Sequence, residues 1–131
     1  MFNIKDYKIS DSFPKLADMM MPNNSNIDNL KKLHTTIVEP IKHRWGNLRF
    51  LSAFRNKLLN AKVGGVKFSD HLEGMALDFY RPESNTKAIY DWIKDSSIPY
   101  RQLIYYKKKN FIHISINNPS LRKIKHEAFT K

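Results

Sequence analysis

Two residues that commonly bind metal ions, His71 and Asp78, stand seven positions apart in the stretch SDHLEGMALDF, residues 69–79. The residues between them are small or apolar, apart from Glu73. The chain has no cysteine, so disulfides, thiolate zinc ribbons and cysteine nucleophiles are excluded. Any metal site must therefore use histidine, aspartate and glutamate, and this pair needs a third ligand.

A third candidate ligand, His113, lies in the alternating stretch FIHIS. The isoleucines on either side of it share one strand face, so the histidine projects from the opposite face. If the strands of Asp78 and His113 are neighbours, the two side chains can converge on one side of a sheet. His71 can then reach them from the loop before the first strand, which bends back at Gly74. Two imidazoles and a carboxylate form a three-ligand zinc site with an open position, the catalytic pattern, so we expect one Zn²⁺ per chain.

The elements that must position these ligands follow from periodicity. Helices are expected near residues 13–20, from Ser25 onward, as a short turn at 56–62, and from Ser84 to about Asp95. Ser25 with Asp28 resembles a capping box, and Pro40 should kink or stop the second helix near Glu39. Strands are expected at 48–54, 74–80, 100–106 and 110–116.

This order of elements predicts an α+β fold, with helices first and a small antiparallel sheet afterwards that carries the metal site. At 131 residues the chain is expected to form a single domain, residues 1–131. Its core would span residues 25–116, and residues 117–131 would form a basic, irregular tail.

The charge of the chain favours anionic partners. The sequence has 23 Lys+Arg against 12 Asp+Glu, a net charge of +11. Nucleic acid, a membrane surface and an acidic polymer such as a cell wall all fit this excess, and so does a basic surface without a special partner. No apolar run approaches the roughly 20 residues of a membrane span. The opening MFNIKDYKIS has no signal-peptide core, so we expect synthesis in the cytoplasm.

A longer stretch, FLSAFRNKLLNAKVGGVKFSDHLEGMALDF, resembles the signature of the zinc D-Ala-D-Ala carboxypeptidase family, peptidase M15, which has the hedgehog/DD-peptidase fold. The matching positions are Ser52, Phe54, Arg55, Leu59, Asn60, Val63, Gly64, Gly65, Ser69, His71, Gly74, Ala76 and Asp78. Later, QLIYYKKKNFIHIS resembles the closing strand pair that carries the family's second histidine. The resemblance covers residues 25–116 and is greatest to short phage-type members.

The resemblance implies a role for each matched residue. The three predicted ligands match the family's zinc ligands. Arg55 matches the arginine that pairs with the peptide's terminal carboxylate or steadies the carbonyl oxygen, a task that suits the guanidinium fork. Ser69 and Ser115 match serines of the two motifs, and we expect both to contact the substrate.

One part of the family's machinery has no match. The carboxylate that usually precedes the second histidine and transfers protons is missing, because residues 100–117 contain no aspartate or glutamate. The corresponding positions hold Gln102, Tyr106 and Asn110. Three alternatives are open: Glu73 swings in as the base, Tyr106 or Gln102 orients the water and stabilises an oxyanion, or efficient hydrolysis has been lost.

Two functions follow from these observations. The first is a zinc metallopeptidase that hydrolyses peptidoglycan stem peptides next to D-alanine, as a monomer, and reaches the wall as phage lysis proteins do. The second is a non-catalytic module that keeps the metal and binds cell wall or nucleic acid. Non-specific affinity for nucleic acid would agree with the charge.

Overall fold

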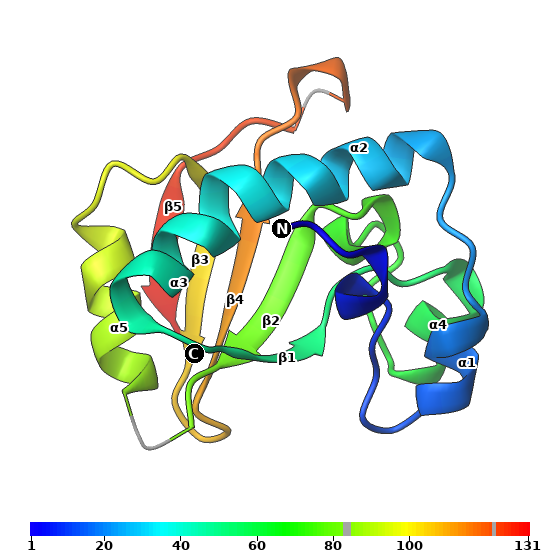
Figure 1. Cartoon of the computed structure of the whole chain (residues 1–131), viewed down its shortest axis with the longest axis horizontal. Helices are drawn as coiled ribbons and strands as arrows, with labels where there is room; N and C mark the ends of the chain where they lie inside the picture. The colour runs from blue at the N-terminus through cyan, green and yellow to red at the C-terminus, as the bar shows by residue number, and fades with distance from the viewer. Residues whose placement is uncertain (83–84, 122) are drawn as a thin grey trace.

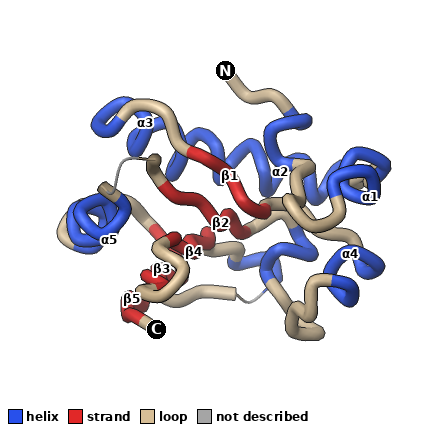
Figure 2. Tube along the Cα trace, turned by 90° about the horizontal axis from the view of Figure 1, so that it is seen from below, coloured by secondary structure: helices blue, strands red, loops and turns tan. Residues whose placement is uncertain are grey.

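The structure, a computed structural model, describes residues 1–82, 85–121 and 123–131. In this part of the chain a five-stranded sheet has the order β1-β2-β4-β3-β5 (Figure 2). Neighbouring strands are antiparallel, except that β5 runs parallel to β3. The strands are β1 Arg49–Ser52, β2 Ala76–Tyr80, β3 Tyr100–Tyr106, β4 Phe111–Ile116 and β5 Glu127–Thr130. The predicted α+β class is therefore confirmed, with a mostly antiparallel sheet.

Five α-helices are found in the described residues, and the longest ones cover one face of the sheet (Figure 1). They are α1 Pro14–Met19, α2 Asn24–Leu33, α3 Glu39–Trp45, α4 Lys57–Lys62 and α5 Thr86–Lys94. The helix α2 contacts β4, and α5 contacts both β3 and β4. None of the helices in this part of the chain is long and apolar enough to cross a membrane.

Alternation along β2 and β4 decides which side chains face these helices. Leu77 and Phe79 on β2, and Ile112 and Ile114 on β4, are completely buried in the hydrophobic core. Because side chains alternate across a strand, the residues between them project from the other face of the sheet. Burial of the apolar face therefore presents the polar residues of the same strands on the face opposite the helices.

The predicted kink or stop near Glu39 corresponds to a change of helix type, because the helical chain continues through Pro40 and the stop itself is wrong. A π-helical turn, His34–Val38, joins α2 to α3. In it the N–H of Glu39 bonds to the carbonyl of His34, five residues back. Pro40 then lies in the first turn of α3, where a missing N–H is tolerated. The π-helical turn thus accommodates Pro40 without a break in the helical chain, and α3 continues to Trp45.

The predicted helix starts need one correction. The capping box of α2 is formed by Asn23 and Asn26, whose side chains each accept a hydrogen bond from the other's backbone N–H. Ser25, the predicted cap, lies inside the helix. Ser84, the predicted start of the later helix, lies outside the described residues, and α5 begins at Thr86.

The tail predicted to be irregular instead completes the sheet. The strand β5 pairs with the free edge of β3, with Gln102 opposite Glu127 and Ile104 opposite Phe129. Ala128 packs against the hydrophobic core. Pairing satisfies the backbone groups of an edge that would otherwise face water. A four-residue strand such as β5 has too short an alternation to be detected from the sequence.

Candidate metal centre

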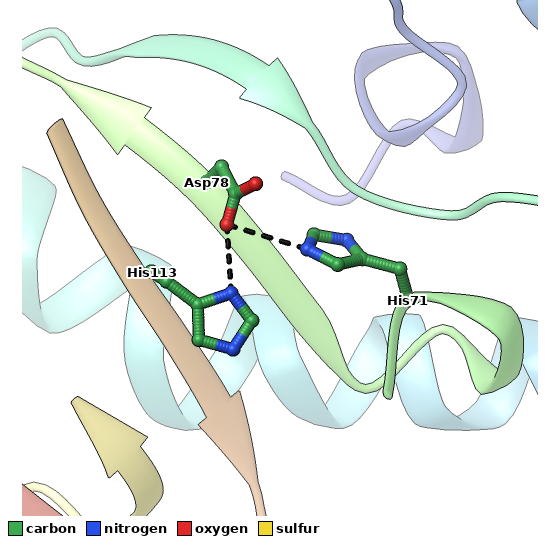
Figure 3. A group of neighbouring side chains, drawn as sticks. All are labelled: His71, Asp78 and His113. Carbon is green, nitrogen blue, oxygen red and sulfur yellow. Dashed lines mark hydrogen bonds and ion pairs between the residues drawn. The ribbon is translucent and has the colours of Figure 1, made fainter. Parts of the chain in front are cut away.

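The three predicted ligands meet on the face of the sheet that the helices leave free. Asp78 and His113 are direct partners in the register of β2 and β4. The Nδ1 of His113 lies 2.8 Å from Oδ1 of Asp78, and the Nε2 of His71 lies 3.3 Å from the same oxygen (Figure 3). Taking one ligand atom from each residue, all lie within 4.8 Å of one another. This is a geometry that a single metal ion could occupy.

His71 reaches the other two from a tight turn. The hydroxyl of Ser69 accepts the N–H of His71 and begins a 3₁₀ turn, Asp70–Glu73. Gly74 ends it in the left-handed conformation, with φ of 74°. A Cβ at Gly74 would lie 2.7 Å from the backbone oxygen of Asn26 in α2. The glycine therefore both bends the chain and lets the turn pack closely against α2.

The orientation of the His71 ring leaves one nitrogen available for a metal. Its Nδ1 lies 2.6 Å from the carbonyl oxygen of Ala53, which can only accept, so Nδ1 carries the proton. The other ring nitrogen, Nε2, then faces Oδ1 of Asp78. It is buried and has no hydrogen-bond partner in the described part of the chain. Two acceptors that face each other at 3.3 Å are favourable only with a proton or a cation between them. The donor set therefore fits a divalent cation.

Asp78 is held in the charged form that a metal ligand needs. Burial alone would raise its pKa, but the neighbouring charges and hydrogen bonds of His71 and His113 outweigh burial and place the pKa well below its ordinary value. Its second oxygen lies 3.6 Å from Nη2 of Arg55. A carboxylate that remains ionised in a buried position suits a cation site.

Arg55 is fixed by neighbours that the sequence did not reveal. Its Nε donates to Oγ of Ser52 at 3.0 Å, and its Nη1 donates to Oδ1 of Asn60 at 3.2 Å. Gly65 lies against this pair, because a Cβ there would be 2.1 Å from Asn60 Oδ1 and 2.9 Å from Arg55 Nη1. All three nitrogens of the guanidinium thus face protein oxygens, and Arg55 orients Asp78. The N-x-x-x-x-G spacing of Asn60 and Gly65 was the available signal.

The predicted substrate-binding serines differ in position. Ser69 lines the cleft beside the metal ligands. Ser115 is completely buried, and its hydroxyl accepts the N–H of Gln102 from the neighbouring strand. The hydroxyl of Ser115 therefore joins two strands, and its burial argues against the predicted contact with substrate.

Glu73, one candidate for the base, is directed away from the metal ligands. Its Oε2 lies 2.7 Å from Nζ of Lys123, and its side chain lines a neighbouring cavity. Asp70, for which the motifs predict no role, is buried and binds Arg101 at 2.6 Å and Lys123 at 3.0 Å. Asp70 fastens the turn that carries His71 to β3 and to the segment before β5. Only its position next to a candidate ligand could have drawn attention to it.

Gln102 and Tyr106 both line the cleft, as expected for residues that could contact a substrate. The amide of Gln102 donates to Glu127 at 2.6 Å. The ring of Tyr106 stacks on Phe111, with 4.6 Å between centroids. Burial, followed by the charge of Asp78, raises the pKa of Tyr106 above its ordinary value. Its hydroxyl therefore stays protonated at neutral pH and can donate a hydrogen bond.

The cleft over the metal ligands has a volume of about 500 Å³. Four cationic side chains line it, Arg55, Arg101, Lys123 and Lys131. The carboxylates among the described residues that line it are Asp70 and Asp78. The cleft thus has more positive than negative side chains even before a metal is added.

A family model described as Peptidase M15 matches residues 14–115 of the chain. No curated protein matches the chain. The matched region contains all three predicted ligands and Arg55. The chain therefore belongs to the peptidase M15 family, which implies a metal-dependent peptidase.

Proposed function

We propose that this member of the peptidase M15 family is a zinc-dependent peptidase that hydrolyses peptidoglycan stem peptides next to D-alanine. The observation that supports it most is the convergence of ligand atoms from His71, Asp78 and His113 within 4.8 Å, in an open cleft. Two imidazole nitrogens and a carboxylate oxygen are a donor set of catalytic zinc sites. The net charge of +11 agrees with an acidic polymer such as the cell wall as target.

When bound, zinc would supply Lewis-acid chemistry that polarises the scissile carbonyl and activates water. The residues of the chain prepare the site for it. The carbonyl of Ala53 fixes the ring of His71, and Arg55 holds the second oxygen of Asp78. Such outer contacts orient metal ligands and tune their affinity. The protonated hydroxyl of Tyr106 lies in the cleft, where it can donate a hydrogen bond to a substrate carbonyl oxygen.

Proton transfer is the step with the least support from the cleft. Of the two carboxylates that line it in the described residues, Asp70 is bound to Arg101 and Lys123, and Asp78 is a proposed ligand. General acid–base catalysis typically contributes about 10²–10⁴-fold to a rate. We therefore expect hydrolysis to be slower by roughly this factor than in a metallopeptidase with a free carboxylate.

The same lack of a free carboxylate favours a second candidate function. A domain that keeps the metal but cannot transfer protons would bind wall peptides or nucleic acid without cutting them. Binding to nucleic acid would weaken steeply with salt, because it would depend on neutralised phosphates.

Elemental analysis of the purified protein and a digest of isolated muropeptides test the proposal together. We expect one zinc per chain, and product formation that a chelator abolishes and added zinc restores. His113→Ala should lose both the metal and the activity. His126→Ala is the control, because His126 is exposed and stacks on Tyr100 away from the cleft. Bound zinc without hydrolysis would favour the binding module, and a His113→Ala variant that keeps its zinc would contradict the ligand assignment.

A further inference from the structure

Two cavities adjoin at the metal ligands. The cleft of about 500 Å³ lies over β4, β3 and β5, and a second cavity of about 310 Å³ lies over β1 and α4. Arg55, Asp78 and Phe111 line both of them. Asp78 therefore stands in the middle of a groove that crosses the sheet from β1 to β5, and the groove continues on each side of the metal ligands.

We infer that this groove takes a peptide chain extending on both sides of the scissile bond, so that the enzyme cuts an internal bond. The inference rests on the proposed peptidase function and names its substrate class. An enzyme that removes a terminal residue needs a closed end and a free cation close to the metal to bind the terminal carboxylate. The groove instead provides space on either side of Asp78 for further residues of the substrate.

Arg55 is the residue that the family resemblance assigned to a terminal carboxylate, and its contacts argue against that task. Its Nε and Nη1 donate to Ser52 and Asn60, and its Nη2 faces Asp78 at 3.6 Å. Binding of a terminal carboxylate in the bidentate manner needs two parallel free N–H groups. Two of the five N–H groups of Arg55 are engaged by Ser52 and Asn60, so turning the side chain toward a substrate would break these hydrogen bonds and move Nη2 away from Asp78. Arg55 is thus held beside Asp78 by the protein itself.

The far ends of the groove come from parts of the chain outside the family match, which spans residues 14–115. Residues before the match line the β1 end: Ser10, Asp11 and Ser12. Residues after the match line the β5 end: Lys123, Phe129 and Lys131. The match therefore covers the metal ligands, whereas these residues at the two ends of the groove lie outside it.

The β5 end of the groove suits a substrate residue with a carboxylate. Lys123 there is balanced by Asp70 and Glu73. Lys131 is exposed and forms no ion pair with the described residues, while its Nζ lies 5.9 Å from the centroid of the Phe129 ring. At the other end, Lys109 lines the cavity over β1. An acidic stem peptide that spans the groove would therefore meet Lys131 at the β5 end, and Lys109 together with Asp11 at the β1 end.

The zinc-loaded protein should be given two probes: a cross-linked dimer of muropeptides and the monomeric pentapeptide muropeptide. We expect cleavage of the dimer at an internal bond. Lys109→Ala and Lys131→Ala should each raise KM for the dimer roughly two- to fivefold without changing kcat, as expected for one exposed ion pair. KM for the monomer should change less. Lys108→Ala and Lys107→Ala are matched controls, because these lysines are exposed but do not line the groove.

The outcomes separate this inference from the proposed function. Release of only a terminal amino acid, with the dimer untouched, would overturn the groove inference and leave a zinc peptidase standing. If neither probe is hydrolysed, the peptidase proposal fails, and calorimetric titration of the same protein with both probes then decides about the groove. Tighter binding of the dimer that depends on Lys109 and Lys131 would support the groove, and equal affinity for both probes would refute it.

Discussion

The two adjacent glycines Gly64 and Gly65 allow a sharp test of how Arg55 supports the metal site. Gly64 has φ of 73°, and a Cβ there would meet nothing within 4 Å. Gly65 has no such φ, but its Cβ would lie 2.1 Å from Oδ1 of Asn60. Gly64→Ala is therefore destabilised by its backbone conformation alone, whereas Gly65→Ala is destabilised by a steric clash alone.

The expected losses of unfolding free energy are similar. Placing a non-glycine residue in the left-handed region costs roughly 1–2 kcal/mol, which applies to Gly64→Ala. Overpacking costs about 1–3 kcal/mol, and the reduced freedom of the unfolded chain offsets about 0.4–1 kcal/mol, which leaves Gly65→Ala near 1–2 kcal/mol. Only the second change displaces Asn60 and with it the hydrogen bond to Arg55. Loss of such an outer contact typically weakens metal binding about 10–100-fold.

Urea unfolding and zinc competition against a chromophoric chelator measure the two effects separately. Both variants should unfold at lower urea than the wild type. Gly65→Ala should bind zinc about 10–100-fold more weakly, whereas Gly64→Ala should bind it like the wild type. Equal zinc affinity of the two variants would refute the reasoning that connects Gly65 through Asn60 and Arg55 to Asp78.

Three further predictions concern stability and can be checked by urea unfolding. Tyr7→Phe should lower the unfolding free energy by about 1–2 kcal/mol, because the buried Tyr7 hydroxyl lies 2.6 Å from Nδ1 of His34. Burial raises the pKa of Tyr7 above its ordinary value of 10.0, so its contribution is complete below pH 10 and declines above it. The difference between wild type and Tyr7→Phe should therefore shrink from pH 9 to pH 11, and a constant difference would contradict this. Gly74→Ala should lower the unfolding free energy by roughly 2–4 kcal/mol, because it combines a φ of 74° with a Cβ 2.7 Å from the backbone oxygen of Asn26. A loss of unfolding free energy below about 1 kcal/mol would be inconsistent with that packing. Asp70→Asn should lower the unfolding free energy by about 2 kcal/mol. This is less than for a fully buried ion pair, because the side chains of its partners Arg101 and Lys123 are 15% and 22% exposed. An unchanged urea midpoint would show that these ion pairs do not hold the turn.

Much of the candidate metal site could be predicted because its geometry depends on strand periodicity. Alternation in the strands of Asp78 and His113 fixes which residues leave the core, and the register of β2 and β4 places these two side by side. The position of His71 also follows from the short turn that Gly74 permits. These are local rules, and the sequence contains all the information that they need.

The contacts around the ligands could not be predicted, because they depend on the path of loops. Arg55 was assigned to the substrate by its place in the motif, yet its partners Ser52 and Asn60 are decided by how the chain turns into α4. Glu73 stood two residues from His71 in the sequence, but Lys123 from a distant segment holds its side chain elsewhere. Neither contact has a periodic signal.

The supports of the three ligands differ in kind, and this predicts a graded response of zinc affinity. The ring of His71 is fixed by a backbone carbonyl, Asp78 by the side chain of Arg55, and His113 by the register of its strand. A side chain can be removed without changing the strands, whereas a register or a carbonyl position cannot change without local unfolding. Removal of a ligand should therefore abolish binding, loss of the Arg55 support should weaken it by an intermediate factor, and changes in the same loop that leave Arg55 in place should have no effect.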